Sequence, residues 1–171
     1  MKKLVWLTAL AALAGCASYS WTSSVPEAMR TVAVPTFRNE SNVTELGSVT
    51  TRQVLREFQR EGTFKLAYQG AAAVEIQGVI KTAGSGNYAH DSRRGARHAE
   101  YRYYLRAEVS VIDKLNGKVL VDNRPYEVET FMVAGQDLLT AKRDASGRLA
   151  EELARAVVDD VLALNWKGEK K

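Results

Sequence analysis

The chain contains one cysteine, Cys16, and two histidines, His90 and His98, among 171 residues. A single cysteine cannot form an intramolecular disulfide, so a disulfide-stabilised framework is excluded. The apolar run from Leu4 to Leu13 has only 10 residues, whereas a membrane-spanning helix needs about 20. No later segment is apolar enough to cross a bilayer.

The N-terminus has the pattern of a secretory signal. Lys2 and Lys3 precede the apolar run, and small residues follow it in Leu13-Ala-Gly-Cys16. A cysteine at this position is similar to the bacterial lipobox, so we expect removal of residues 1–15 and acylation of Cys16. The alternative is a secreted protein with a free thiol, which is a liability in an oxidising compartment. The next residues, Ala17 and Ser18, are not acidic, which favours the outer membrane over retention at the inner one.

Cleavage would remove two lysines and lower the net charge from +4 to +2, so the pI of 9.2 overstates how basic the mature protein is. The charge and the exported location argue against nucleic acid as a partner. The remaining 156 residues suit one domain. We expect a lipidated tether over 16–30, a single domain over 31–166 and a frayed tail over 167–171.

The first half of the domain predicts strand, helix and strand. Residues 31–37 are β-rich, and Pro35 belongs at a strand end or edge because it lacks an N–H. Apolar residues four apart predict a helix ended by Gly62, with Leu46, Thr50, Val54 and Phe58 on its buried face. A strand over 63–68 follows, and this order favours two parallel strands.

The second half predicts a meander and a long helix. Residues 101–112 alternate, with Tyr103, Leu105 and Val109 facing inward and Arg102, Arg106 and Glu108 outward. Asn116-Gly117 predicts a hairpin turn. The inward parity of the next strand then changes, which predicts a bulge near Asn123 to Pro125. A helix over 136–166 completes an α+β two-layer sandwich, with two helices on one face of a small mixed, mainly antiparallel sheet.

Catalytic patterns are weak. His90, Asp91 and His98 could in principle supply a base or metal ligands, but their spacing matches no metal motif. The segment 84–89 matches G-x-G-x-x-G/A, but no helix follows to hold a phosphate. We therefore predict no enzyme, no cofactor beyond the covalent lipid on Cys16 and no metal. A small periplasmic hydrolase that uses His90 or His98 is the enzymatic alternative.

The clearest binding signal is a basic tract, formed by Arg93, Arg94, Arg97, Arg102 and Arg106. Arginine binds phosphate and carboxylate through two parallel hydrogen bonds. The tract is therefore a candidate site for a phosphorylated glycolipid or for an acidic partner surface. The alternative is a solvated loop with charges that protect a sheet edge, partly neutralised by Glu100 and Glu108.

These features together resemble one family. They are the lipobox, Tyr19, the strand Thr31-Val-Ala-Val-Pro-Thr-Phe-Arg-Asn-Glu-Ser41, Leu55-Arg-Glu-Phe58, Glu100-Tyr-Arg102 and Gly117-Lys-Val-Leu120. The set resembles the lipopolysaccharide-assembly lipoproteins (LptE-like) of Gram-negative bacteria over nearly the whole mature chain. Ala17 and Val121 depart from residues that are frequent in the family, a glycine and a tryptophan.

The resemblance implies a non-enzymatic protein of the outer membrane. Members lie in the lumen of a β-barrel lipopolysaccharide translocon, assist its assembly, and are thought to bind lipopolysaccharide during delivery to the outer leaflet. A barrel lumen is polar, so the outward-facing charges of 101–112 would suit it. The alternative from another class is an unrelated envelope lipoprotein that acts as a scaffold for peptidoglycan or a secretion complex.

Overall fold

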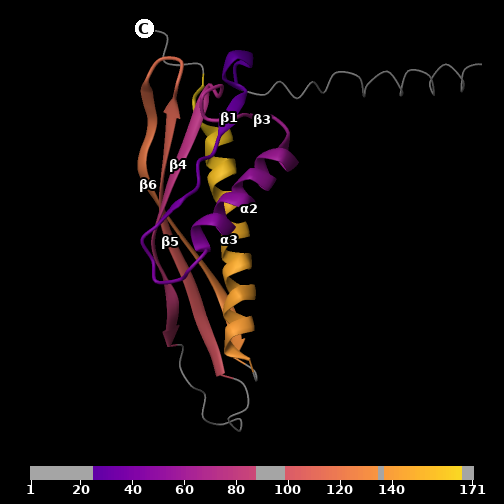
Figure 1. Cartoon of the computed structure of the whole chain (residues 1–171), viewed down its shortest axis with the longest axis vertical. Coiled ribbons are helices and arrows are strands. Elements are labelled where there is room, and N and C mark those ends of the chain that lie inside the picture. Colours follow the sequence, from indigo (N-terminus) through magenta and orange to yellow (C-terminus); the bar gives the residue numbers. More distant parts are fainter. Residues whose placement is uncertain (1–24, 88–98, 135–136, 167–171) are drawn as a thin grey trace, which may run out of the picture.

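The computed structural model describes residues 25–87, 99–134 and 137–166. The elements are the 3₁₀ turn η2 (Glu27–Met29), β1 (Thr31–Ala33), β2 (Arg38–Asn39), α2 (Leu46–Glu61), β3 (Lys65–Leu66), β4 (Val74–Asn87), β5 (Ala99–Asp113), β6 (Lys118–Ala134) and α3 (Leu138–Ala163). The six strands form one sheet, in which both helices lie on the same side (Figure 1). The predicted α+β sandwich is confirmed.

The sheet is mixed. Its order is β3-β1-β4-β5-β6, and β2 pairs separately with β4. β1 pairs in parallel with β3 and β4, and β2 also runs parallel to β4, whereas β4, β5 and β6 form a long antiparallel meander. The strand predicted over 31–37 is interrupted, because residues 34–37 leave the sheet between β1 and β2. Pro35 lies in this interruption, where no main-chain N–H is needed.

Both helices form where apolar residues recur at helical spacing. Leu46, Thr50, Val54 and Phe58 are all buried on α2, which ends at Gly62 with a φ of 83° as predicted. Asp137 caps α3 by accepting hydrogen bonds from the N–H groups of two residues in the first turn. α3 covers β6 and β5, and α2 packs against α3. The core therefore lies between the helices and the inner face of the sheet.

The predicted alternation of β5 is confirmed for the side chains that the structure describes. Tyr103, Leu105, Ala107, Val109 and Val111 are buried against the helices. The bulge predicted near Asn123 is also found: between the pairs Val109–Arg124 and Val111–Val121, β6 has one residue more than β5, and Asn123 has a φ of 43°. A second shift, at Leu120, was not predicted. It turns Val119 and Val121 to opposite faces, since they lie opposite Ile112 and Val111 respectively.

The long strands separate two ends of the molecule. β1 pairs with the first residues of β4, beside the hairpin that joins β5 to β6. The last residues of β4 pair with the first residues of β5 at the opposite end (Figure 1). The 15 residues of β5 span about 50 Å at roughly 3.3 Å per residue. The described chain thus begins at one end of the sheet, and segment 88–98 connects β4 and β5 at the other.

Candidate functional site

The outer face of the sheet, which no described helix covers, carries charged side chains in cross-strand pairs. Arg102 on β5 lies 3.1 Å from Glu129 on β6, and Arg106 lies 2.8 Å from Glu127. These two arginines belong to the predicted anion-binding tract, and each has a carboxylate partner from the neighbouring strand. The guanidinium of Arg106 also stands 5.3 Å from the centre of the Tyr104 ring.

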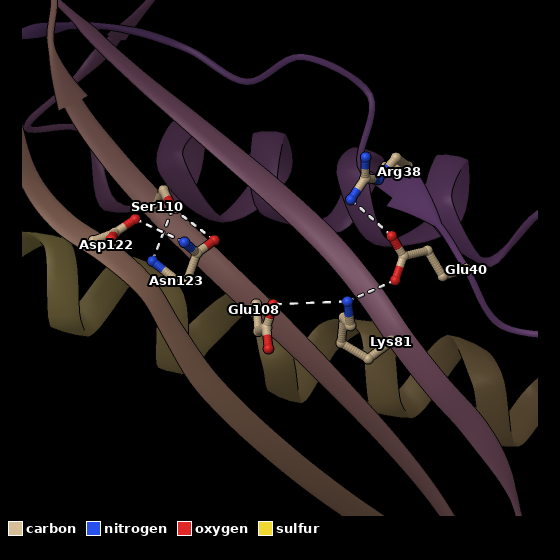
Figure 2. A network of polar contacts seen from close by, with 7 residues as sticks. All are labelled: Arg38, Glu40, Lys81, Glu108, Ser110, Asp122 and Asn123. Atoms are coloured by element: carbon tan, nitrogen blue, oxygen red, sulfur yellow. Dashed lines mark hydrogen bonds and ion pairs between the residues drawn. The ribbon is translucent and has the colours of Figure 1, made fainter.

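A second group of charges connects β2, β4 and β5. Glu40 accepts contacts from Lys81 at 2.6 Å and from Arg38 at 2.7 Å, and Lys81 also lies 3.9 Å from Glu108 (Figure 2). Lys81 is the extra residue of β4 between the pairs Ile80–Ala107 and Thr82–Arg106. The irregularity in β4 thus lies where a single lysine joins carboxylates from both of its neighbouring strands.

These pairs shift the ionisation of their members toward the charged forms. The hydrogen bond from Lys81 lowers the pKa of Glu40, and the same contact raises the pKa of Lys81. The hydrogen bond from Arg106 likewise lowers the pKa of Glu127. All these side chains are at least one-third exposed, so solvent screens each pair and it stabilises the fold only slightly. Their main consequence is a polar face on which positive and negative charges balance.

One carboxylate of this face is enclosed. Glu75 on β4 alternates with the core residues Val74 and Ile76, yet it too is only 2% exposed. Its oxygens accept hydrogen bonds from Gln77 at 2.7 Å, Gln69 at 3.1 Å and Lys114 at 3.2 Å. Burial alone would raise the pKa of Glu75, but these three donors outweigh it and the pKa is lowered. Glu75 therefore joins the β3–β4 connection to the β5–β6 hairpin, a structural role that its alternating pattern did not reveal.

A pocket of about 460 Å³ lies where β6 ends and α3 begins. Its lining comprises Phe131, Met132, Asp137, Thr140, Ala141, Asp144 and Arg148. Arg148 donates to the carbonyl oxygen of Phe131 at 3.1 Å. Phe131 is 59% exposed, and Leu139 in the first turn of α3 is 71% exposed. Sequence analysis did not predict this pocket, because its walls come from segments whose packing is set by the tertiary fold.

Several predicted site residues lie outside the described residues. They are Cys16 and the expected tether with Tyr19, the basic residues Arg93, Arg94 and Arg97, the groups His90, Asp91 and His98, and residues 167–171. Of the nucleotide-like motif, Gly84 and Gly86 lie within β4 and form part of the strand. In the described ranges, no three histidine, cysteine or acidic side chains are grouped to hold a metal ion. No helix of this part of the chain is both long and apolar enough to cross a membrane.

The fold and the charged outer face define a small α+β sandwich with one exposed, charge-paired sheet face. The chain belongs to the Lipopolysaccharide-assembly (LptE) family, whose model matches residues 29–163. Members of this family are non-enzymatic outer-membrane lipoproteins, so membership supports a role in lipopolysaccharide assembly. The match includes the strand motif at 31–41 on which the resemblance was based.

Solved structures share the fold at low sequence identity. A putative lipoprotein from Caulobacter crescentus is 16% identical with a TM-score of 0.51, and the superposition covers 78% of this chain and 92% of that one. A minor lipoprotein from Acinetobacter baumannii is 7% identical with a TM-score of 0.53, over 79% and 94% of the two chains. A Xanthomonas campestris protein is 8% identical with a TM-score of 0.57, over 82% and 88%. No curated protein sequence matches the chain.

Proposed function

We propose that this protein is a lipid-anchored partner of the β-barrel that exports lipopolysaccharide across the outer membrane. In this proposal Cys16 carries the lipid, and the folded part plugs the barrel lumen and assists its assembly. The observation that carries the proposal is the family match over residues 29–163. The lipobox at Leu13–Cys16 supports the location.

The outer sheet face supports a place inside a polar lumen. Its arginine–glutamate pairs present positive and negative charge in equal number, so neither sign is in excess. The lumen of such a barrel contains water and polar side chains, so a charged sheet face is more favourable there than an apolar face would be. Contact between the two proteins would then involve exchange of exposed ion pairs, which costs little.

The long strands support lipopolysaccharide contact at the end remote from the anchor. The described chain begins just before β1, whereas the ends of β4 and β5 that flank the segment with Arg93, Arg94 and Arg97 lie at the opposite end of the sheet. In an anchored protein, the strand ends that flank these arginines would lie about the length of β5 from the point where the described chain begins. Guanidinium groups there would bind the phosphates of lipid A bidentately.

Arg102 and Arg106 would take a different part in this binding. Because Glu129 and Glu127 already neutralise them, a lipid phosphate would have to displace a carboxylate. We therefore assign the first phosphate contact to the three loop arginines, with Arg102 and Arg106 as secondary contacts.

Affinity purification from detergent-solubilised outer membranes tests the proposal. We expect the wild-type chain to bring down one large β-barrel protein together with lipopolysaccharide. Cys16→Ala should remain uncleaved and be lost from the outer-membrane fraction, with Ser18→Ala as the matched control that is processed normally. Absence of any barrel from the wild-type eluate would refute the proposed partnership, and normal processing of Cys16→Ala would refute the anchor.

A further inference from the structure

β6 is the edge strand on one side of the sheet, and within the described residues it pairs only with β5. Unpaired edge strands recruit other strands unless bulges, prolines or charges prevent it. The first half of β6 has such protection, because it contains two register shifts and Pro125. The second half, from Tyr126 to Ala134, pairs with β5 residue by residue and contains neither a shift nor a proline. Its two charged residues, Glu127 and Glu129, form ion pairs with Arg106 and Arg102 of β5.

The orientation of the backbone in this second half follows from the sheet register. The N–H of Glu40 donates to the carbonyl of Ile80 at 2.9 Å, so Ile80 faces β2 and its neighbour Val79 faces β5. Val79 lies opposite Glu108, which therefore faces β4, and the adjacent Ala107 faces β6. Along β5, the main-chain groups of successive residues therefore point alternately to β4 and to β6. This alternation is unbroken against β4, because the extra residue at the irregularity, Lys81, belongs to β4 and not to β5.

The same alternation applies to β6. Ala107 lies opposite Tyr126, so the main chain of Tyr126, and of every second residue after it, bonds to β5. The main-chain groups of Glu127, Glu129 and Phe131 consequently point out of the sheet. No main-chain partner from outside the strand is found for Glu127 or Glu129 in the described part of the chain.

Arg148 supports this orientation independently. Its guanidinium donates to the carbonyl oxygen of Phe131 at 3.1 Å and to the hydroxyl of Thr130 at 3.4 Å. A guanidinium N–H of Arg148 thus occupies the outward-facing carbonyl of Phe131, and a strand added at this point would replace that hydrogen bond. The edge carbonyl accepts a hydrogen bond from outside the sheet, as it would from a partner strand.

The pocket of about 460 Å³ adjoins the end of this edge. Proteins that bind peptides by strand addition take affinity from main-chain hydrogen bonds and specificity from side-chain pockets next to the edge. Here Phe131, Met132 and Ala141 give the pocket apolar walls, and Asp137 and Asp144 place carboxylates in its lining. The edge and the pocket therefore combine both elements of a strand-binding site.

Charge decides between a second copy and a different chain. Antiparallel pairing of two β6 strands about Glu129 would place Glu129 opposite its own copy, and like charges in that position are destabilising. A segment with basic residues beside Glu127 and Glu129 avoids this repulsion and would continue the arginine–glutamate pairs of β5 and β6 onto a third strand. In the pocket, such a segment would meet the carboxylates of Asp137 and Asp144 beside the guanidinium of Arg148. We propose that the β6 edge from Tyr126 to Met132 binds an extended basic and apolar segment of the partner protein as an added strand. This proposal rests on the proposed function, since the barrel is the partner considered.

Proline substitution at an outward-facing position tests the proposal. Glu129→Pro removes the outward N–H and leaves the bonds to β5, while Glu129→Ala removes the same side chain and keeps the N–H. We expect Glu129→Pro to recover at least tenfold less barrel than Glu129→Ala in the affinity purification. Circular dichroism and thermal melting confirm folding, and Glu127→Pro against Glu127→Ala repeats the comparison should Glu129→Pro not fold.

A labelled peptide measures the edge without the barrel. The peptide copies residues 101–109, the strand that already pairs with β6, and its control carries Arg102→Glu and Arg106→Glu. Fluorescence anisotropy should show that the first peptide binds Glu129→Ala and binds Glu129→Pro at least tenfold more weakly. The control peptide should bind Glu129→Ala at least tenfold more weakly than the first peptide does.

The outcomes separate the two proposals. If the wild type recovers no barrel, the proposed function fails. If Glu129→Pro nevertheless weakens peptide binding, the proposal that the β6 edge binds an added strand still stands. If barrel and peptide bind Glu129→Pro as well as Glu129→Ala, strand addition is overturned. Strand addition is also overturned if the peptide does not bind and Glu129→Pro recovers as much barrel as Glu129→Ala. A wild-type dimer that Glu129→Pro dissociates would overturn the proposal too, because the occupant of the edge would then be a second copy.

Discussion

The ring of Phe37 packs directly on the backbone of Gly78. A Cβ atom placed on Gly78 would lie 2.2 Å from Cε2 of that ring, and one placed on Gly47 would lie 2.4 Å from the carbonyl oxygen of Phe37. The N–H of Phe37 donates to Oγ1 of Thr51 on α2 at 2.9 Å. The segment between β1 and β2 is thus fixed between β4 and α2. This contact gives a physical reason for the phenylalanine in the strand motif that identifies the family.

Substitution of Gly78 tests this contact. Gly78→Ala must displace a buried ring, and forced overpacking costs about 1–3 kcal/mol. We expect a loss of about 2–3 kcal/mol in the free energy of unfolding, measured by urea denaturation. Gly86→Ala is the matched control on the same strand, because no atom lies within 4 Å of its added Cβ. That variant should be neutral or slightly more stable, and equal effects of the two substitutions would contradict the packing role.

The enclosed carboxylate of Glu75 predicts a pH dependence of stability. Its pKa is lowered in the folded state, so its ionised form is favoured by folding. The stabilisation is therefore complete above the unfolded pKa of about 4.3 and is lost as the pH falls through the lower folded value. Glu75→Gln keeps the shape and removes the charge, and we expect it to cost about 1–2 kcal/mol at pH 7.

Denaturation at several pH values measures this effect. The difference between the wild type and Glu75→Gln should be largest near neutral pH and should shrink below about pH 4. Glu152→Gln on the exposed side of α3 is the control, and it should change stability little at any pH. A difference that stays constant down to pH 2 would show that the charge of Glu75 is not what stabilises the fold.

Charge reversal in the basic segment tests lipopolysaccharide binding. Arg93→Glu with Arg94→Glu should weaken binding at least tenfold, because charge-assisted hydrogen bonds contribute about 1.5–3 kcal/mol each. Arg52→Glu with Arg56→Glu changes the net charge equally on the exposed side of α2. Binding can be measured with purified protein and labelled lipopolysaccharide at two salt concentrations. Equal losses in the two double variants would indicate only a net-charge effect, and unchanged binding would leave the barrel partnership alone.

Sequence periodicity determined the elements whose residues interact with near neighbours along the chain. The i, i+4 pattern from Leu46 to Phe58 fixed the buried face of α2, and Gly62 fixed its end. The alternation from Tyr103 to Val111 assigned the two faces of β5. The change of parity in β6 required a bulge, because a strand that buries one face cannot change parity without an extra residue. The strand motif at 31–41, together with the lipobox and the shorter motifs, resembles the family to which the chain belongs.

The tertiary structure decided which residues face one another across strands. The sequence suggests Glu100 and Glu108 as partners of the basic tract, but Arg102 and Arg106 pair with Glu129 and Glu127 of β6. The burial of Glu75 likewise depends on Lys114 and Gln69, which come from separate connections. Such contacts follow from the register between strands, which bulges shift by single residues, and local periodicity carries no information about what lies opposite. The pocket beside β6 has the same origin, because the end of a strand and the start of a helix form it only after both have packed.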